Sequence, residues 1–201
     1  MKSSENNDSK QAFNEDCQDL LGNIILIGMP GSGKTTLGKK LAKTLDWAFI
    51  DTDNLLVSWF GLELEQLLNN LGIEGFLQAE KKIVQELILH RSVIATGGSV
   101  IYSKAAMRKL QDIGKIIYLH ADYQIVEKRV SNNPQRGLVT PGGQTLWDVY
   151  RERVPHYREY AELEISTENT NPQECIYSIM EGLNEKEEFP EIERILDGGP
   201  E

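Results

Sequence analysis

The segment Gly28–Thr35 carries the residues with the clearest chemical meaning in this chain. It reads GMPGSGKT and matches the phosphate-loop pattern GxxxxGK[ST]. An apolar segment, NIILI, precedes it and a leucine-bearing segment follows, as a strand and a helix do in this motif. Glycines let the backbone wrap a phosphate with its N–H groups pointing inward, and a helix N-terminus adds positive potential. The motif therefore predicts a nucleotide phosphate site.

Two side chains of this loop have distinct roles in phosphoryl chemistry. We expect Lys34 to reach the β- and γ-phosphates of ATP as a point charge, and Thr35 to offer its hydroxyl to Mg²⁺. The loop residues expected to bind the nucleotide are Gly31, Ser32, Gly33, Lys34, Thr35 and Thr36.

Two carboxylates, Asp51 and Asp53, follow the next apolar segment. Strand ends in open α/β sheets face the ligand crevice, and residues two apart on an extended strand point to the same side. One carboxylate can then hold Mg²⁺ through water, and the other can take or orient the proton of a substrate hydroxyl. The structural alternative is that Asp53 caps a helix beginning at Asn54. The phosphate loop that precedes them favours catalysis.

Two further segments contain residue types that are common in ligand sites. The apolar run 93–95 ends in Thr-Gly-Gly-Ser, where Gly97 and Gly98 allow either close approach of a ligand or a tight turn. Residues 131–143 are rich in Asn, Pro and Gly, which is typical of a functional or disordered loop, and Arg136 is the only cation in it.

Short apolar runs alternate with longer amphipathic stretches along the middle of the chain, which is typical of a parallel sheet covered by helices. The expected strands are Asn23–Ile27, Ala48–Ile50, Ser92–Ala95, Lys115–Leu119 and Leu163–Ser166. One expected helix follows Lys34. The others lie at about 73–90, 103–110, 122–130, 145–159 and 173–183. We therefore expect an α/β fold with the motifs gathered at its strand ends.

The composition limits the class of protein. Hydrophobic residues make up 40% and charged residues 26%, which excludes a wholly disordered chain. The net charge is −10, with five acidic and two basic residues in 1–21 and seven acidic and two basic residues in 184–201. We expect both acidic segments to be solvated ends, and the lack of a basic stripe disfavours nucleic acid as a partner.

The sequence also argues against a membrane-spanning, secreted or disulfide-built protein. No apolar run approaches the ~20 residues of a membrane-spanning helix, and the N-terminus lacks the apolar core of a signal peptide. The two cysteines, Cys17 and Cys175, are too few for a disulfide-built fold and lack metal-ligand spacing. We expect a cytoplasmic monomer that does not bind a membrane.

Together these motifs resemble those of the shikimate kinase family of P-loop small-molecule kinases, over roughly residues 22–183. The features that carry the resemblance are the phosphate loop Gly28–Thr35, DTD at 51–53, GFLQAE at 75–80, TGG at 96–98, the spacing of Arg129 and Arg136, RVPHY at 153–157 and the pair Asn171–Pro172. The resemblance implies a three-layer P-loop kinase fold, with a five-stranded parallel sheet covered by helices on both faces and a mobile lid at about 131–143. The acidic segments 1–21 and 184–201 lie outside this kinase domain.

The resemblance further implies ATP-dependent phosphorylation of a small hydroxylated metabolite, with shikimate as the first candidate. It also implies a role for each residue that matches the family's motifs. Lys34, Asp53 and Arg136 are the expected catalytic residues, with Arg136 on the lid. Thr35 and Asp51 are expected to hold Mg²⁺, and Arg129 and Pro172 to enclose adenine. The expected acceptor-binding residues are Asp53, Gly97, Gly98 and Arg153.

The sequence departs from the family pattern at two positions. Leu77 stands where the family has a second carboxylate-binding arginine, and Ser99 replaces the third glycine after the third strand. Leucine cannot replace a bidentate guanidinium–carboxylate pair. Three explanations remain open: Arg153 and Lys81 hold the carboxylate of shikimate, the acceptor is another small hydroxy compound, or Leu77 only packs against its neighbours.

Other function classes fit the sequence less well. A GTPase switch needs a guanine-reading N/TKxD segment, which does not follow the phosphate loop. Gluconate-type and nucleoside-monophosphate kinases share the loop and lid plan but lack the RxPxY placement that Arg153–Tyr157 shows. A catalytically silent nucleotide-binding relative is the remaining alternative, although such a protein need not retain Lys34, Asp53 and Arg136.

Overall fold

A five-stranded sheet organises the computed structural model, which describes residues 22–132, 143–168, 171–184 and 189–196. Its strands are β1 (Asn23–Ile27), β2 (Ala48–Asp51), β3 (Ser92–Ala95), β4 (Gly114–His120) and β5 (Leu163–Ser166). They are all parallel and lie in the order β2-β3-β1-β4-β5. The central strand β1 is buried throughout, which explains its unbroken apolar sequence.

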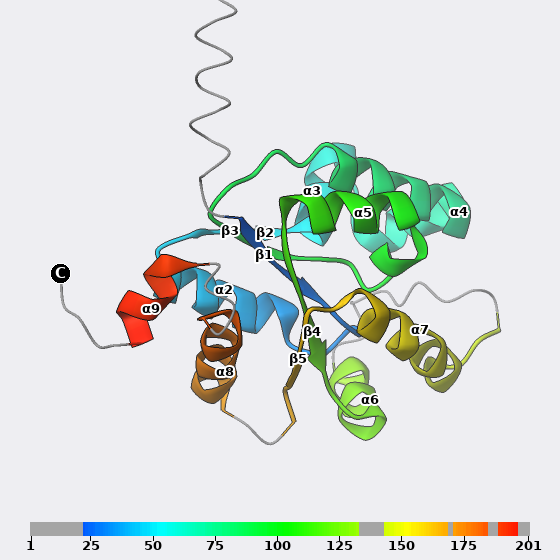
Figure 1. Cartoon of the computed structure of the whole chain (residues 1–201). Helices are drawn as coiled ribbons and strands as arrows, with labels where there is room; N and C mark the ends of the chain where they lie inside the picture. The colour runs from blue at the N-terminus through cyan, green and yellow to red at the C-terminus, as the bar shows by residue number, and fades with distance from the viewer. Residues whose placement is uncertain (1–21, 133–142, 169–170, 185–188, 197–201) are drawn as a thin grey trace, which may run out of the picture.

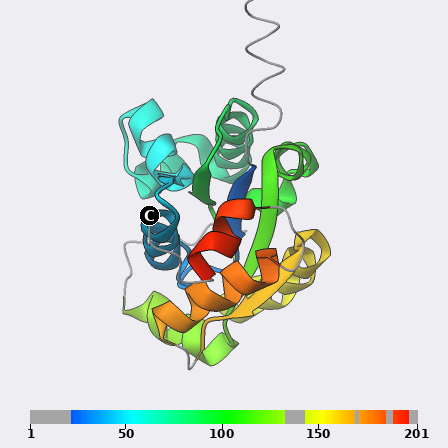
Figure 2. The same cartoon turned by 60° about the vertical axis from the view of Figure 1, so that its left-hand side comes forward.

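Helices cover both faces of this sheet (Figures 1 and 2). The described helices are α2 (Lys34–Leu45), α3 (Thr52–Phe60), α4 (Leu64–Gln85), α5 (Lys104–Ile113), α6 (Tyr123–Ser131), α7 (Leu146–Tyr160), α8 (Pro172–Asn184) and α9 (Pro190–Leu196), with a 3-10 turn η1 (Val100–Tyr102). One core lies between the sheet and α2, α8 and α9, and a second lies between the sheet and α5, α6 and α7. The predicted three-layer α/β architecture is confirmed.

The helix predicted at 73–90 differs from the observed α4 at both ends. α4 begins at Leu64, where Glu63 and Gln66 form a reciprocal capping box, and it ends at Gln85. Gly72 interrupts it with φ 65° and ψ 179°, so the helix is kinked there. Ile88, placed on the apolar face of this helix by its spacing, follows the helix and is 84% exposed.

The expectation of a solvated end at 184–201 is wrong for the described part of that segment. Phe189 and Ile192 are buried in the core that α2 and α8 form with the sheet. The Phe189 ring meets Trp47 edge-on, with 5.7 Å between the ring centroids. The acidic composition of the segment did not indicate that these few apolar side chains are buried. They extend the core beyond residue 183.

We predict that Phe189→Ala lowers the free energy of unfolding by about 3–5 kcal/mol, because a buried aromatic side chain is removed from a packed core. Chemical denaturation measures this change. The control Ile88→Ala removes an exposed side chain and is expected to change stability by less than about 0.5 kcal/mol. Equal stability of the Phe189 variant and the unmodified protein would mean that the α9 segment does not pack on the core.

Candidate active site

The phosphate loop connects the end of β1 to the start of α2, as its sequence predicts. Gly31 and Gly33 have φ values of 81° and 102°, a left-handed conformation that favours glycine. A Cβ atom at Gly31 would also lie 3.2 Å from Cβ of Arg129. The loop thus needs glycine both for its turn and for its contact with α6.

Two polar side chains show that this loop fits an anion. Nζ of Lys34 donates hydrogen bonds of 2.8 Å and 2.9 Å to the carbonyl oxygens of Gly28 and Met29, which folds the lysine back over the loop. The hydroxyl of Ser32 is buried and has no hydrogen-bond partner among the described residues. A buried donor of this kind is normally satisfied, and a bound phosphate oxygen would satisfy it.

The hydroxyl of Thr35 lies beside the carboxylate of Asp51 and donates a 2.9 Å hydrogen bond to Oδ2. Hydroxyl and carboxylate oxygens are ligands that Mg²⁺ accepts in nucleotide sites. The donor set therefore fits the metal that the sequence predicts.

The arrangement of the two aspartates differs from the sequence prediction. α3 begins at Thr52, so Asp51 is its N-cap and accepts a 3.1 Å hydrogen bond from the backbone N–H of Asp53. Asp53 therefore lies in the first turn of the helix, not two residues along an extended strand. Both carboxylates nevertheless line the same cavity.

A cavity of about 600 Å³ lies between the phosphate loop, the ends of β2 and β3, and helices α3, α4 and α7. Lys34 and Asp53 both line it, as a phosphoryl-transfer site requires. Gly97, Gly98 and Arg153, predicted to bind the acceptor, line it too. Five residues from distant parts of the sequence thus meet in one cavity.

The paired glycines after β3 serve the close packing of this cavity wall. The backbone N–H of Gly97 donates a 3.0 Å hydrogen bond to the hydroxyl of Thr52. A Cβ atom at Gly97 would collide with Oε1 of Glu80 and would lie 2.9 Å from Oδ1 of Asp53. A Cβ atom at Gly98 would lie 3.1 Å from Nη1 of Arg153. Gly97 therefore leaves no room for a side chain beside Glu80, and a side chain at Gly98 would require Arg153 or Pro30 to shift.

Arg153 is a buried cation on α7, with 1% of its surface exposed. Its Nε donates a 3.2 Å hydrogen bond to the hydroxyl of Tyr102, and its guanidinium carbon lies 5.2 Å from the centroid of that ring. The neighbouring Tyr157 donates a 2.6 Å hydrogen bond to the carbonyl oxygen of Gly98. Arg153 is therefore a buried member of the cavity wall and not a solvated arginine on the helix surface.

Glu80 is the charged wall residue that sequence reasoning left without a role, although it belongs to the GFLQAE segment. It is 2% exposed, and its Oε2 accepts a 2.8 Å hydrogen bond from the hydroxyl of Ser99. Burial raises the pKa of Glu80 from 4.5 to about 7, with a further upward contribution from the charge of Asp53. The Ser99 hydrogen bond and the charges of Arg153 and Lys34 act in the opposite direction.

Leu77 and Lys81 do not line this cavity. α4 presents Phe76 and Glu80 to it, four residues apart on one helix face. The next positions, Leu77 and Lys81, are rotated by about 100° around the helix axis. The alternative in which Lys81 holds the acceptor carboxylate therefore finds no support in the lining of this cavity.

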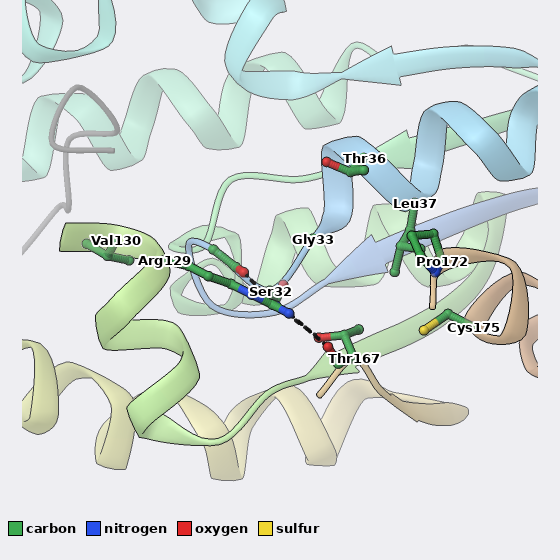
Figure 3. Close-up of a pocket in the computed structure, with 10 residues that line it drawn as sticks. Ser32, Gly33, Thr36, Leu37, Arg129, Val130, Thr167, Pro172 and Cys175 are labelled. Carbon is green, nitrogen blue, oxygen red and sulfur yellow. Dashed lines mark hydrogen bonds between the residues drawn. The ribbon is translucent and has the colours of Figure 1, made fainter. Parts of the chain in front are cut away.

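A second cavity, of about 270 Å³, lies beside the phosphate loop, between residues of α2, α6 and α8 (Figure 3). It is lined by Arg129 and Pro172, the two residues predicted to enclose adenine, together with Gly31, Ser32 and Gly33 of the loop and Thr36 of α2. Arg129 is held by hydrogen bonds of 3.1 Å to the carbonyl oxygen of Gly31 and 2.9 Å to that of Thr167. Sequence reasoning missed Thr167, because a single threonine after a strand carries no pattern.

Arg136 and most of the expected lid lie outside the described residues, so its catalytic role stays a prediction. No helix in the described ranges is long and apolar enough to cross a membrane.

Comparisons with known proteins agree with this geometry. Residues 30–184 match the family described as "Shikimate kinase". The chain is 33% identical to shikimate kinase 2 of Pectobacterium carotovorum over 165 residues, which covers 80% of this chain and 95% of the relative. Its structure is similar to that of shikimate kinase from Acinetobacter baumannii in complex with shikimate, with a TM-score of 0.77, 28% identity, and coverage of 85% of this chain and 97% of the other. It also shares the fold of shikimate kinase from Bacteroides thetaiotaomicron, with a TM-score of 0.70, 24% identity, and coverage of 81% and 98%.

We predict that Glu80 makes stability depend on pH. Its folded-state pKa of about 7 lies above the ordinary 4.5, so the folded protein binds this proton more tightly than the unfolded chain. The contribution of Glu80 to the free energy of unfolding is neutral below about pH 4.5. It becomes unfavourable as the pH rises from 4.5 through 7, by on the order of 3 kcal/mol in total.

The Glu80→Gln variant removes that titration, so its stability relative to the unmodified protein should increase between pH 5 and pH 8. Denaturant titrations at several pH values measure the difference. Glu65→Gln, at an exposed glutamate of the same cavity, is the matched control and should change stability by less than about 0.5 kcal/mol. A pH-independent difference for Glu80→Gln would contradict the elevated pKa.

Proposed function

This chain belongs to the shikimate kinase family and is an ATP-dependent kinase of a small hydroxylated metabolite, and from that premise we propose how its two cavities perform the reaction. The smaller cavity, with Arg129 and Pro172, takes the adenine of ATP. The larger cavity takes the acceptor, and the phosphate loop between them holds the triphosphate. The observation that carries this proposal is that Lys34 and Asp53 line one cavity.

The reaction that we propose requires one proton transfer and one phosphoryl transfer. The acceptor oxygen forms a bond to the γ-phosphorus while the bond from that phosphorus to the leaving oxygen of ADP breaks. The hydroxyl proton moves to the carboxylate of Asp53. Lys34 and the N–H groups of the loop offset the charge on the transferring group.

Thr35 and Asp51 are the residues that we propose to hold Mg²⁺, directly or through water. The bound metal supplies positive charge to the phosphate oxygens. Their 2.9 Å hydrogen bond supports this role, because it already brings a hydroxyl and a carboxylate oxygen together at the phosphate loop. Asp51 also caps α3, so the same side chain positions Asp53.

The acceptor is proposed to bind through a carboxylate at Arg153, beside the backbone of Gly97 and Gly98. The burial of Arg153 supports this, because an anionic partner strongly stabilises a buried guanidinium. Shikimate is the first acceptor to test, since it is the molecule in complex with the Acinetobacter baumannii relative.

A different small hydroxylated acceptor is the second candidate, and the position of Leu77 favours it. We propose that Leu77 replaces a carboxylate-binding arginine of the family. Neither Leu77 nor Lys81 lines the cavity, so α4 offers no cation to a carboxylate there. A catalytically silent protein is the less favoured alternative, because Lys34, Asp51 and Asp53 are retained and brought together. We also propose that the enzyme is a cytoplasmic monomer.

We predict that Asp53→Asn lowers kcat by at least about 100-fold, because the amide cannot accept the hydroxyl proton. ADP release in the presence of acceptor measures the loss, and ATP binding should persist. Lys34→Ala should be at least as damaging, through loss of charge at the γ-phosphate. The matched control is Asp46→Asn, at an exposed left-handed C-cap that asparagine tolerates, and it should retain full activity. Undiminished turnover by Asp53→Asn would remove the proposed proton acceptor.

We predict that Leu77→Arg raises kcat/KM for shikimate at least tenfold, or about 1.4 kcal/mol, because it restores the carboxylate-binding arginine that the family resemblance implies at this position. Steady-state kinetics with shikimate tests this expectation. Leu77→Met extends the side chain without adding charge and should leave the value near that of the unmodified protein. A wild-type enzyme with an ordinary KM for shikimate, below ~1 mM, would instead show that no second arginine is needed.

A further inference from the structure

Tyr102 contacts Arg153 from outside the acceptor cavity. It lies on η1, is half-buried and is not among the described residues that line the cavity. Nε of Arg153 donates a 3.2 Å hydrogen bond to its hydroxyl, and the guanidinium carbon lies 5.2 Å from the centroid of its ring. The contact therefore combines a charge-assisted hydrogen bond with a cation–π attraction, and it holds the guanidinium at two points.

This contact determines which part of the guanidinium faces the cavity. A guanidinium is a planar fork with five N–H donors, so a partner that fixes Nε also fixes the directions of the other two nitrogens. Nη1, which points away from the Nε–H bond, lies beside Gly98, where a Cβ atom would be 3.1 Å from it. Gly98 lines the acceptor cavity. An acceptor carboxylate in that cavity therefore meets the Nη1 side of Arg153.

The hydroxyl of Tyr102 has a second partner that favours this arrangement. A tyrosine hydroxyl can accept one hydrogen bond while it donates another. Burial raises the pKa of Tyr102, and a hydrogen bond to Glu152 also raises it, as expected when the phenol donates its proton to a carboxylate. The hydrogen bond from Arg153 lowers this pKa, as expected when the phenol oxygen accepts. The three side chains thus form a chain of hydrogen bonds that runs from Arg153 to Glu152.

Tyr157 supports the same guanidinium from a different element. It belongs to the RVPHY motif, and its hydroxyl donates a 2.6 Å hydrogen bond to the carbonyl oxygen of Gly98. Burial lowers the pKa of the Arg153 guanidinium, and interactions with Tyr157 and Tyr102 outweigh that effect and raise it. Tyr102 belongs to none of the motifs that predicted the site, so its contact adds a residue to those that the motifs supply.

We infer that Tyr102 is a positioning residue for the acceptor, because it holds Nε of Arg153 so that Nη1 receives the acceptor carboxylate beside Gly98. This inference rests on the proposed kinase function. The hydrogen bond exists before the acceptor arrives, so its effect is to preorganise the guanidinium. Tyr102 then contributes to acceptor affinity through Arg153 and has no part in ATP binding or in the transfer of the phosphoryl group.

The variant Tyr102→Phe keeps the ring and removes only the hydroxyl. We expect KM for shikimate to rise at least about fivefold, while kcat and KM for ATP each stay within about twofold, because a hydrogen bond to a charged group is lost and the reacting groups are untouched. Tyr150→Phe is the matched control. It removes a half-buried hydroxyl that donates a 3.1 Å hydrogen bond to the carbonyl oxygen of Ala121, outside the lining of both described cavities. That variant should keep KM for shikimate within about twofold.

A pair of ligands distinguishes the positioning of Arg153 from a general change in the cavity. The methyl ester of shikimate lacks the negative charge that Arg153 binds, so the orientation of the guanidinium matters less for it. Its inhibition constant against phosphorylation of shikimate should change by less than about twofold in Tyr102→Phe. A distorted cavity would instead weaken the acid and the ester equally.

The hydrogen bond can also be measured without an acceptor. In protein labelled with ¹⁵N-arginine, the Nε–H signal of Arg153 is identified by its loss in Arg153→Lys. We expect its hydrogen to exchange with water at least about tenfold faster in Tyr102→Phe than in the unmodified protein, because the N–H loses its acceptor. Glu152→Ala removes the exposed carboxylate at the other end of the chain of hydrogen bonds. It should raise KM for shikimate in the same direction but by a smaller factor.

The outcomes separate this inference from the proposed function. Normal turnover of shikimate with an unchanged KM in Tyr102→Phe would overturn the role of Tyr102 and leave the kinase function standing. Equal losses for shikimate and its methyl ester would overturn it as well. If the unmodified enzyme released no ADP with shikimate, the first acceptor of the proposed function would be wrong. The Nε–H exchange would still test the contact, and equal rates in the two proteins would overturn it.

Discussion

The active site depends on three parallel strands that end at the same edge of the sheet. β1 leads into the phosphate loop, β2 ends at Asp51, and β3 ends before Gly97. Hydrogen bonds tie these ends together: the backbone N–H of Thr96 donates to the carbonyl oxygen of Leu26, and that of Gly97 donates to the hydroxyl of Thr52. A shift of any strand end would separate the lysine of the loop from the carboxylates, so the register of the sheet sets the chemistry.

The same constraint explains why charged groups are buried at this edge. Lys34, Glu80 and Arg153 are each at most 9% exposed, which is unfavourable unless partners or a ligand compensate. The loop carbonyls hold Lys34, Tyr102 contacts Arg153, and Ser99 holds half of Glu80. The other oxygen of Glu80 has no hydrogen-bond partner among the described residues, which makes the burial of this carboxylate costly.

Much of the fold follows from local sequence signals. The strands are short apolar runs because both faces of a parallel sheet are covered, and three of the five predicted strands have the observed bounds. The phosphate loop, Asp53, the Gly97–Gly98 pair, Arg129, Arg153 and Pro172 all line the two cavities where their motifs predict ligands. The positions of these residues follow from motifs that combine a backbone requirement with a chemical one, and their roles stay predictions.

The features that sequence reasoning missed depend on tertiary contacts. α3 begins directly after β2, so Asp51 is the N-cap of this helix and Asp53 lies in its first turn, not on an extended strand. The burial of Glu80 depends on Ser99 and Gly97, which pack against it from the loop after β3. The burial of Phe189 depends on Trp47, more than a hundred positions earlier in the sequence, inside a segment whose composition is acidic. No local pattern encodes these contacts.

The central claim is that the terminal phosphate of ATP lies between Lys34 and Asp53, facing the acceptor cavity. A crystal structure with Mg²⁺ and a non-hydrolysable ATP analogue measures this position most directly. We expect Nζ of Lys34 to leave the loop carbonyls and contact a γ-phosphate oxygen, with the carboxylate of Asp53 across the open cavity. A γ-phosphate directed away from Asp53, or a closed wall between the two, would contradict it.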